Sequence, residues 1–284
     1  MATMTVADGR PLKVAVMGGT SLLKSTFFSG LTPVPTSTPY GTVTLFTSTT
    51  SPVVFLQRHV SIPNVDYTPP HAINHRAHVA ALLQLGVTHV LGVCCVGSLN
   101  EEVPPGTLVI PDDYSALYCP PMYLHDDQNA HIVPGLDMPL RDRILTAVRG
   151  WADEAKRGGA AVRVVDTGVY VQTPGPRFET PAEVRVLAAN VGAAEGIVGV
   201  VGMTAANEAT ICKEAALPYA AVCMVDNYAN GIGGDKLTPE AFHASVKQNL
   251  TVVESVVQAI LQGLGVFAAA APAVPAAAPV LAGA

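Results

Sequence analysis

The sequence has few charged side chains. Of its 284 residues, 13% are Asp, Glu, Lys or Arg, whereas 49% are apolar, so a large core can be buried. The formal net charge is −6 at pH 7. Nucleic-acid backbones are bound by clustered Lys and Arg, so we expect no nucleic-acid partner. An anionic small molecule is still compatible with this charge, because a few well-placed donors can hold one phosphate.

Cysteine is scarce and shows no metal-binding or disulfide pattern. The five cysteines are Cys94, Cys95, Cys119, Cys212 and Cys223, an odd number without any CxxC pair. Adjacent Cys94 and Cys95 would point to opposite faces of a strand, which suits neither a shared metal nor a disulfide. We therefore expect reduced, buried thiols in a cytoplasmic protein, and no bound metal.

Long apolar runs are also missing. No uninterrupted stretch is long enough to cross a bilayer, and the first 13 residues contain no apolar core of a signal peptide, so we expect no membrane partner. The end of the chain is rich in Ala and Pro. We expect an N-terminal extension over residues 1–11, one domain over 12–264, and a flexible Ala/Pro tail over 265–284.

Short β-branched runs alternate with longer helical patterns, which predicts one α/β domain with a central mixed β-sheet flanked by helices. Thr180 is the expected N-cap of one helix, with Pro181 at its first position. Strands are predicted at Leu12–Met17, Thr42–Thr47, Val53–Gln57, Thr88–Val96, Thr107–Ile110, Val162–Gln172, Ile197–Met203 and Tyr219–Val225. Helices are predicted at His71–Leu85, Pro139–Lys156, Ala182–Ala189, Thr204–Ala216 and from Pro239 to about Leu264.

Small or polar residues follow several of these apolar runs. Ligands in α/β folds bind beyond the carboxyl ends of the strands, so we expect these residues to converge on one site. They are Gly18–Thr20, Arg58–His59, Cys95–Ser98, Thr173–Glu179, Met203–Thr204 and Asp226–Asn227.

Two of these segments carry anion-binding chemistry. Gly18 and Gly19 let backbone N–H groups approach an anion, and Thr20 adds a hydroxyl, although a plain tight turn would read the same way. The pattern is neither the dinucleotide motif nor the P-loop. Arg58 offers a planar fork for phosphate oxygens, and the alternative is a surface ion pair at a strand end. His59 suits either a phosphate ligand or a structural histidine.

The loop Thr173–Glu179, with the sequence TPGPRFE, is the most specific feature. Its prolines stiffen a loop that presents Phe178, which can stack on a heterocycle, beside Glu179, which can accept from ring N–H groups. The alternative places Phe178 in the core and Glu179 in a helix N-terminal turn, where acids are favoured. Glu183, three residues after Thr180, suits a capping box and is taken as structural.

GGT, RH, GSL-x-EE-x-x-PG, GPRFET-x-AE, GMT and a strand ending in Asn occur in this order. The set resembles the trimeric purine nucleoside phosphorylase and 5′-methylthioadenosine phosphorylase family, from about Val14 to Gln262. The resemblance implies phosphate-dependent cleavage of purine nucleosides to the free base and ribose 1-phosphate, a pentosyltransferase reaction of purine salvage. It also implies a homotrimer or a hexamer of trimers, with inorganic phosphate as co-substrate and no cofactor.

The resemblance also implies roles for single residues. Phosphate would be bound by Thr20, Arg58, His59 and Thr204, with Cys94 and Cys95 lining its site. Met203 would lie against the ribose, Phe178 would pack on the base, Asn227 would bind near N7 and Glu179 would bind the N1 edge. Catalysis would then consist of placing phosphate and stabilising charge on the leaving purine, by Asn227, Glu179 and Arg58.

The identity of the substrate depends on two ends of this site. Glu179 and Asn227 favour a 6-oxopurine, whose N1–H a carboxylate can accept. Asp226 precedes Asn227, so a shift by one residue would put an acid in the pocket. Nucleoside-specific relatives have a His where this chain has Pro239, and His243 lies one turn later. An apolar wall there would suit methylthioadenosine or methylthioinosine.

Two alternative functions are compatible with the same fold. A nucleosidase would use water in place of phosphate and would not need the Arg58 clamp. An inactive nucleotide-binding or scaffold protein is the alternative of another class. Val60 after Arg58-His59 and Asn207 after the GMT segment depart from the family pattern and are compatible with it.

Overall fold

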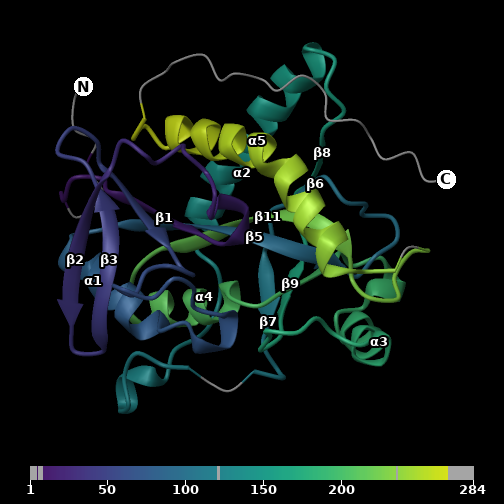
Figure 1. The fold of residues 1–284 in the computed structure, drawn as a ribbon, viewed down its shortest axis with the longest axis horizontal. Helices are drawn as coiled ribbons and strands as arrows, with labels where there is room; N and C mark the ends of the chain where they lie inside the picture. The colour runs from purple at the N-terminus through teal and green to yellow at the C-terminus, as the bar shows by residue number, and fades with distance from the viewer. Residues whose placement is uncertain (1–4, 6–8, 120–121, 235, 268–284) are drawn as a thin grey trace.

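The computed structural model describes residue 5 and residues 9–119, 122–234 and 236–267. A mixed β-sheet with helices on both faces forms its centre, which confirms the expected fold class (Figure 1). The strands are β1 Val14–Gly18, β2 Thr32–Thr38, β3 Gly41–Thr47, β4 Val53–Gln57, β5 His89–Ser98, β6 Thr107–Val109, β7 Asp113–Ser115, β8 Arg163–Val165, β9 Val169–Gln172, β10 Gly199–Gly202 and β11 Tyr219–Tyr228. The helices are α1 His75–Gln84, α2 Met138–Arg157, α3 Pro181–Asn190, α4 Ala205–Glu214 and α5 Pro239–Gly263, with short 3-10 turns between them.

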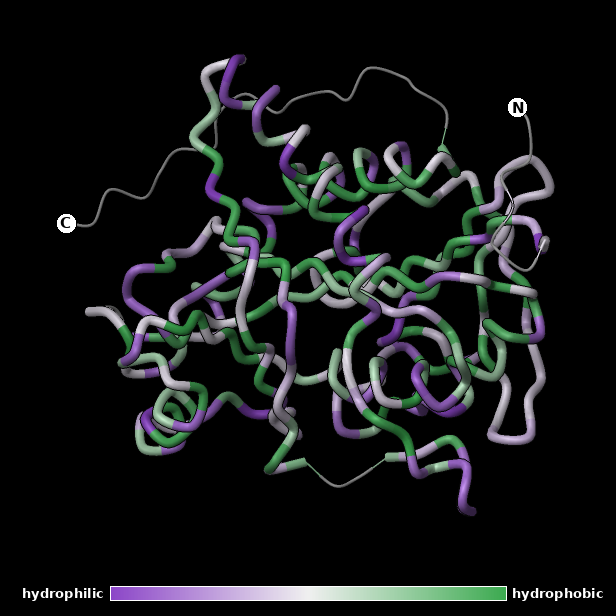
Figure 2. The backbone as a smooth tube through the Cα atoms, turned by 180° about the vertical axis from the view of Figure 1, so that it is seen from behind, coloured by the Kyte–Doolittle hydropathy of each residue, from purple (hydrophilic) through white to green (hydrophobic). Residues whose placement is uncertain are grey.

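The helices cover the two faces of the sheet, because its central strands are apolar on both sides. In β1, Val14 and Val16 face one core and Ala15 and Met17 face the other, as a period of two requires. Helices α1 and α4 pack on the Met17 face, and α2 and α5 pack on the Val16 face (Figure 1). Figure 2 shows apolar segments running through the middle of the molecule, where these strands lie.

Strand β5 lies at the centre of the sheet, and three other strands pair with it. Strand β11 pairs in parallel along one edge, from Val90 to Ser98. The opposite edge is shared by β1, which pairs in parallel with His89–Val93, and β10, which pairs antiparallel with Gly97 and Ser98. Strands β1 and β10 therefore point toward each other along one edge of β5. Their carboxyl ends meet beside residues 94–96.

Two strands are absent from the prediction. Strand β2 contains Pro33 and Pro35, and it lies at the edge of the sheet with β3 as its partner. Alternate residues of an edge strand turn their N–H groups outward, so prolines two residues apart are tolerated there. Strand β7 is three residues long and pairs with β9. The run predicted as one strand at Val162–Gln172 is divided into β8 and β9.

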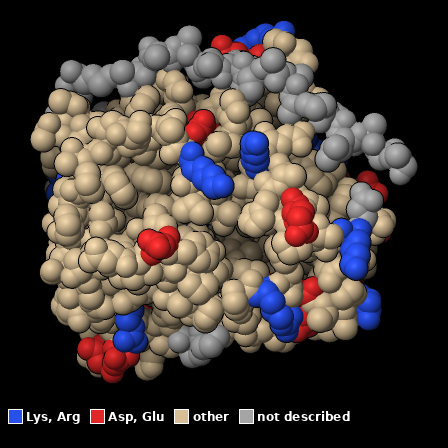
Figure 3. Space-filling model, viewed as in Figure 1, with Lys and Arg blue, Asp and Glu red and all other residues tan. Residues whose placement is uncertain are grey.

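The C-terminal end of the described chain packs beyond the expected domain boundary at residue 264. Val266 is buried, and Phe267 stacks on Phe27 with 5.7 Å between the ring centroids, so the described chain packs beyond Leu264. The remainder of the expected tail, 268–284, and residues 1–4 and 6–8 of the expected extension lie outside the described residues. None of the described helices is long and apolar enough to span a membrane. On the face in Figure 3, acidic and basic side chains are interspersed.

Candidate active site

A cavity of about 90 Å³ opens where the ends of β1 and β10 meet beside β5. Its walls come from distant parts of the sequence, as expected for residues that follow strand ends. It is lined by Gly19, Thr20, Arg58, His59, Pro70, Cys95, Val96, Gly97, Phe178, Glu179, Val201, Gly202, Met203, Thr204, Asn227, Ala229, Leu237 and Phe242.

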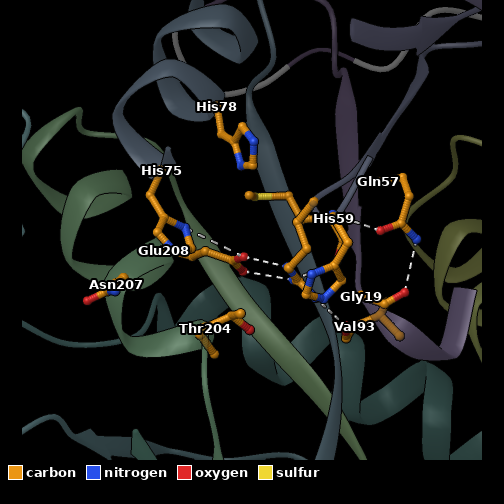
Figure 4. Close-up of polar contacts among 12 residues, drawn as sticks. Gly19, Gln57, His59, His75, His78, Val93, Thr204, Asn207 and Glu208 are labelled. Atoms are coloured by element: carbon orange, nitrogen blue, oxygen red, sulfur yellow. Dashed lines mark hydrogen bonds and ion pairs between the residues drawn. The ribbon is translucent and has the colours of Figure 1, made fainter. Parts of the chain in front are cut away.

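Gln57, the last residue of β4, ties two of the predicted segments together. Its Nε2 donates to the carbonyl of Gly19 at 2.9 Å, and its Oε1 accepts from the backbone N–H of His59 at 3.0 Å (Figure 4). Gln57 is buried, so these hydrogen bonds satisfy its amide without water. The loop after β1 and the segment after β4 are thereby held at a fixed separation.

Arg58 lies under the cavity and is 1% exposed, so its ion pair is buried and not at the surface. Its Nε and Nη2 donate to the two carboxylate oxygens of Glu208 at 2.7 and 3.0 Å. Glu208 is itself fully buried and also accepts from the hydroxyl of Tyr219 at 2.8 Å. Burial alone would lower the pKa of Arg58, but the Glu208 carboxylate holds this pKa well above its ordinary value.

The remaining donors of Arg58 determine what it can offer a ligand. Nη1 donates to the carbonyl of Val93 and Nη2 to that of Met17, both at 2.9 Å. Since a guanidinium has five N–H groups, one N–H of Nη1 is left without a partner among the described residues. A Cβ placed on Gly19 would lie 2.5 Å from this Nη1. Arg58 therefore presents one N–H to the cavity beside Gly19, in place of a two-pronged fork.

Three histidines lie near this pair and are held neutral. Burial lowers the pKa of His59 to about 4 and that of His78 to about 3, with Arg58 adding to both effects. His59 makes a hydrogen bond from Nδ1 to the carbonyl of Thr68, 2.9 Å away, so its Nε2 side is available to the cavity. His75 lies 4.0 Å from Glu208, and burial and His78 keep its pKa well below the ordinary value.

The segment after β10 supplies the next wall. Thr204 is the N-cap of α4, and its backbone N–H donates to the hydroxyl of Tyr170 at 3.0 Å. Gln172 Oε1 accepts from the N–H groups of Ala206 and Asn207, so these two N–H groups at the start of α4 already have a partner. Of these residues, Thr204 is the one that lines the cavity.

A further wall of the cavity is formed by the TPGPRFE loop. Glu179 is 8% exposed, and its Oε1 accepts from the hydroxyl of Thr173 at 2.6 Å, which fixes the carboxylate. Phe178 is half-buried and meets Phe242 edge to face, with the centroids 5.4 Å apart. The capping box of Thr180 and Glu183 is confirmed. An aromatic ring and an anchored carboxylate thus share one wall.

Asn227 reaches the cavity because β11 contains an irregularity in front of it. The register changes between Val225 and Asn227, as in a β-bulge. Asp226 does not line the cavity, is 2% exposed and accepts from Asn249 at 2.8 Å. Burial raises the pKa of Asp226 to about 6, although hydrogen bonding to Asn249 and to Cys95 opposes the shift.

Nine of the twelve predicted site residues line the cavity, and Cys94, Asp226 and Pro239 do not. Cys94 is buried, and hydrogen bonding to Cys223 lowers the pKa of its thiol. Asp226 faces α5 because of the bulge. Pro239 is exposed at the start of α5, and Leu237 and Phe242 line the cavity in its place.

The sequence interpretation missed Gln57, Glu208, Leu237 and Phe242. Gln57 is the single polar residue of an otherwise apolar run, VVFLQ, and that was a usable signal. Phe242 is the first aromatic residue of α5, three positions after Pro239.

The family of the chain follows from a match to the model described as the phosphorylase superfamily, over residues 13–262. The chain belongs to this family. A probable 6-oxopurine nucleoside phosphorylase of Archaeoglobus fulgidus is 34% identical over 253 residues, which cover 87% of this chain and 96% of the relative. A probable S-methyl-5′-thioinosine phosphorylase of Methanothermobacter thermautotrophicus is 35% identical over 230 residues, which cover 79% of this chain and 75% of the relative. The resemblance drawn from the motifs is confirmed.

Solved structures show the same fold. Methylthioadenosine phosphorylase from Schistosoma mansoni in complex with adenine superimposes with a TM-score of 0.74, covering 89% of this chain and 92% of that one. The two sequences are 22% identical. This likeness supports the mixed α/β architecture.

Proposed function

We propose that the protein is a purine nucleoside phosphorylase that acts on 6-oxopurine nucleosides, with inorganic phosphate as co-substrate and no metal or organic cofactor. The observation that carries the proposal is that one cavity is lined by two chemically distinct sets of residues. Gly19, Thr20, Arg58 and Thr204 carry groups that can bind an anion, and Phe178, Glu179 and Asn227 carry groups that can bind a purine. The relatives named as 6-oxopurine nucleoside phosphorylases support it.

In this proposal phosphate sits beside Gly19 and Thr20, between Thr204 and His59. Arg58 contributes one N–H and a positive charge that Glu208 balances. The remaining hydrogen bonds involve neutral groups, with hydroxyl and backbone N–H groups as donors and Nε2 of His59 as an acceptor. They fix the position of phosphate more than they attract it. Cys95 closes the floor below the anion.

The purine would pack on Phe178. Because Thr173 already holds Oε1 of Glu179, the other carboxylate oxygen is the one that would accept from N1–H of hypoxanthine or guanine. Adenine has no hydrogen at N1 and would face this charge without a bond. Asn227 would bind N7 and stabilise the negative charge that develops on the leaving base, while Met203 would lie against the ribose.

A second substrate, 5′-methylthioinosine, is favoured by one observation. Leu237 and Phe242 line the cavity, whereas His243 is exposed and Pro239 lies outside the lining. No polar side chain of α5 is therefore among the described residues that line the cavity. An apolar wall accepts a methylthio group more readily than a hydroxyl. A relative named as a probable S-methyl-5′-thioinosine phosphorylase fits the same substrate.

We further propose that the protein is a cytoplasmic homotrimer or a hexamer made of two trimers. A second cavity of about 500 Å³ is lined in part by the TPGPRFE loop, which contributes Thr173, Gly175 and Glu179 among its residues. Exposed apolar side chains lie on its lining, with Tyr118 at 50% and Val186 at 49%. A second copy packed here would cover this surface and stiffen the loop that carries Glu179. Native mass spectrometry tests the assembly.

The function is tested by the turnover of inosine, guanosine, adenosine, methylthioadenosine and methylthioinosine, with and without phosphate. We expect phosphate-dependent release of base, faster for hypoxanthine and guanine than for adenine. Asn227→Asp should shift preference toward 6-aminopurines, since a carboxylate can accept from N6. Turnover that persists without phosphate would indicate a nucleosidase. Absence of turnover with every nucleoside would indicate a binding or scaffold role.

A further inference from the structure

Helix α5 is anchored unevenly along its length. Its C-terminal half is held by the buried apolar side chains Val253, Val256, Val257, Ile260 and Leu261. In the stretch from Pro239 to Val252, all of which the structure describes, the buried side chains are Val246 and Asn249. The half of α5 that carries Phe242 therefore has one buried apolar side chain, Val246, and one buried polar side chain, Asn249.

The polar anchor is a directed hydrogen bond to β11. Asn249 Nδ2 donates to Asp226 Oδ1 at 2.8 Å, and the two residues are 8% and 2% exposed. The same Nδ2 also lies 3.5 Å from the hydroxyl of Ser245, one turn earlier. A buried polar pair is satisfied in few arrangements, so it fixes the position of the two elements that it joins.

The bulge in β11 connects this pair to the cavity. It turns Asp226 toward α5 and leaves Asn227, the next residue, in the cavity lining. Phe242 precedes Asn249 by seven residues, which is two helical turns, so the two side chains project from the same face of α5. A movement of Asn249 relative to Asp226 would therefore carry Phe242 past Phe178 and Asn227.

We propose that Asp226 and Asn249 are positioning residues that hold the N-terminal half of α5, and with it Phe242, over the nucleoside end of the cavity. The inference rests on the nucleoside site proposed above. Neither residue touches the substrate. Asp226 acts through Asn249, and Asn249 acts through the helix that places Phe242.

The pair can be broken and rebuilt by exchanging its members. Asn249→Asp places two carboxylates face to face and removes the donor. The double variant Asp226→Asn/Asn249→Asp restores one donor and one acceptor in the opposite direction. Asp226→Asn alone keeps an amide that can accept from Asn249, so it should change the site less than Asn249→Asp. Ser255→Ala is the matched control, because it removes another buried polar contact of α5, with Trp151 Nε1 at 2.8 Å, away from the cavity.

Two measurements separate positioning from general damage. Asn249→Asp should raise the KM for inosine about tenfold at pH 8 and leave the KM for phosphate within about twofold, since one lost buried hydrogen bond costs on the order of a factor of ten. The double variant should recover most of that loss. Deuterium uptake over residues 238–249 should rise in Asn249→Asp, return in the double variant and stay unchanged in Ser255→Ala.

The proposal is overturned if Asn249→Asp leaves both the inosine KM and the deuterium uptake unchanged, or if the exchanged pair does not recover. It is also overturned if the phosphate KM rises in parallel with that of inosine. If Asn249→Asp does not fold, Asn249→Ala gives the same comparison and the exchanged pair must restore folding. A wild-type protein that cleaves no nucleoside would refute the proposed function alone, because deuterium uptake reports on the pair without substrate.

Discussion

Replacing Glu208 tests the buried charge pair under the phosphate end of the cavity. In Glu208→Gln one acceptor oxygen is retained, but an amide N–H₂ faces the donors of Arg58 and the carboxylate charge is gone. Glu208 is fully buried and accepts from Arg58 at 2.7 and 3.0 Å. Two charges about 4 Å apart at an effective dielectric constant of about 20 attract by about 4 kcal/mol. We therefore expect the variant to lose about 3–5 kcal/mol of unfolding free energy.

The assay is urea unfolding followed by the fluorescence of Trp151, the single tryptophan, which belongs to α2 and is buried against α5. Arg58→Met should cost a similar amount, because it leaves Glu208 buried without a cation. The double variant should cost less than the sum of the two, by about 2–3 kcal/mol.

The control for this experiment is an exposed ion pair. Arg76 and Asp126 lie 3.0 Å apart, with side chains 33% and 81% exposed. Asp126→Asn should cost less than about 1 kcal/mol. A Glu208→Gln protein that unfolds at the wild-type urea midpoint would refute the reasoning, as would a double variant whose loss equals the sum.

Three further predictions concern single positions. Gly19→Ala would place a Cβ 2.5 Å from Arg58 Nη1, so steady-state kinetics should show at least a roughly tenfold higher KM for phosphate and an unchanged KM for nucleoside. His59 and His78 have folded pKa values of about 4 and about 3, below the ordinary value of 6.5. The stability that their neutral forms contribute is therefore present above pH 6.5 and is lost as the pH falls, by about 2 kcal/mol per histidine at pH 5. A melting temperature equal at pH 7 and pH 5 would contradict this. Asp226 has a pKa raised from 3.8 to about 6, so its charged form destabilises the fold as pH rises through 6; Asp226→Asn should gain up to about 3 kcal/mol in urea unfolding at pH 8 and little at pH 4.

The fold could be predicted because its signals are local. Apolar runs, helix caps and the residues after each strand are read from a few neighbouring positions, and they placed Thr20, Glu179 and Asn227 in one cavity. The reversed approach of β10 to β5 depends on tertiary pairing, and no local pattern encodes it. Consequently, the sequence predicted one site beyond the strand ends, but not that two opposed strand ends meet there.

The errors at single residues have physical causes. Alternation along a strand would have Asp226 and Asn227 on opposite faces, but only the bulge decides which of them faces the cavity. The role of Arg58 as a fork was expected from its residue type. Its backbone acceptors Met17 and Val93 are distant in sequence, so the number of donors left for a ligand could not be known.

The pairing of Arg58 with Glu208 has a consequence for the choice of anion. Arg58 is the single Lys or Arg among the described residues that line the cavity, and its charge is matched by a carboxylate. Glu179 adds a second carboxylate to the same cavity, so the site has little long-range attraction for anions in general, and added salt should not slow phosphate capture. Selection must come from shape and from the match of donors and acceptors, which gives a protonated phosphate an advantage over sulfate, because sulfate has no hydrogen to donate.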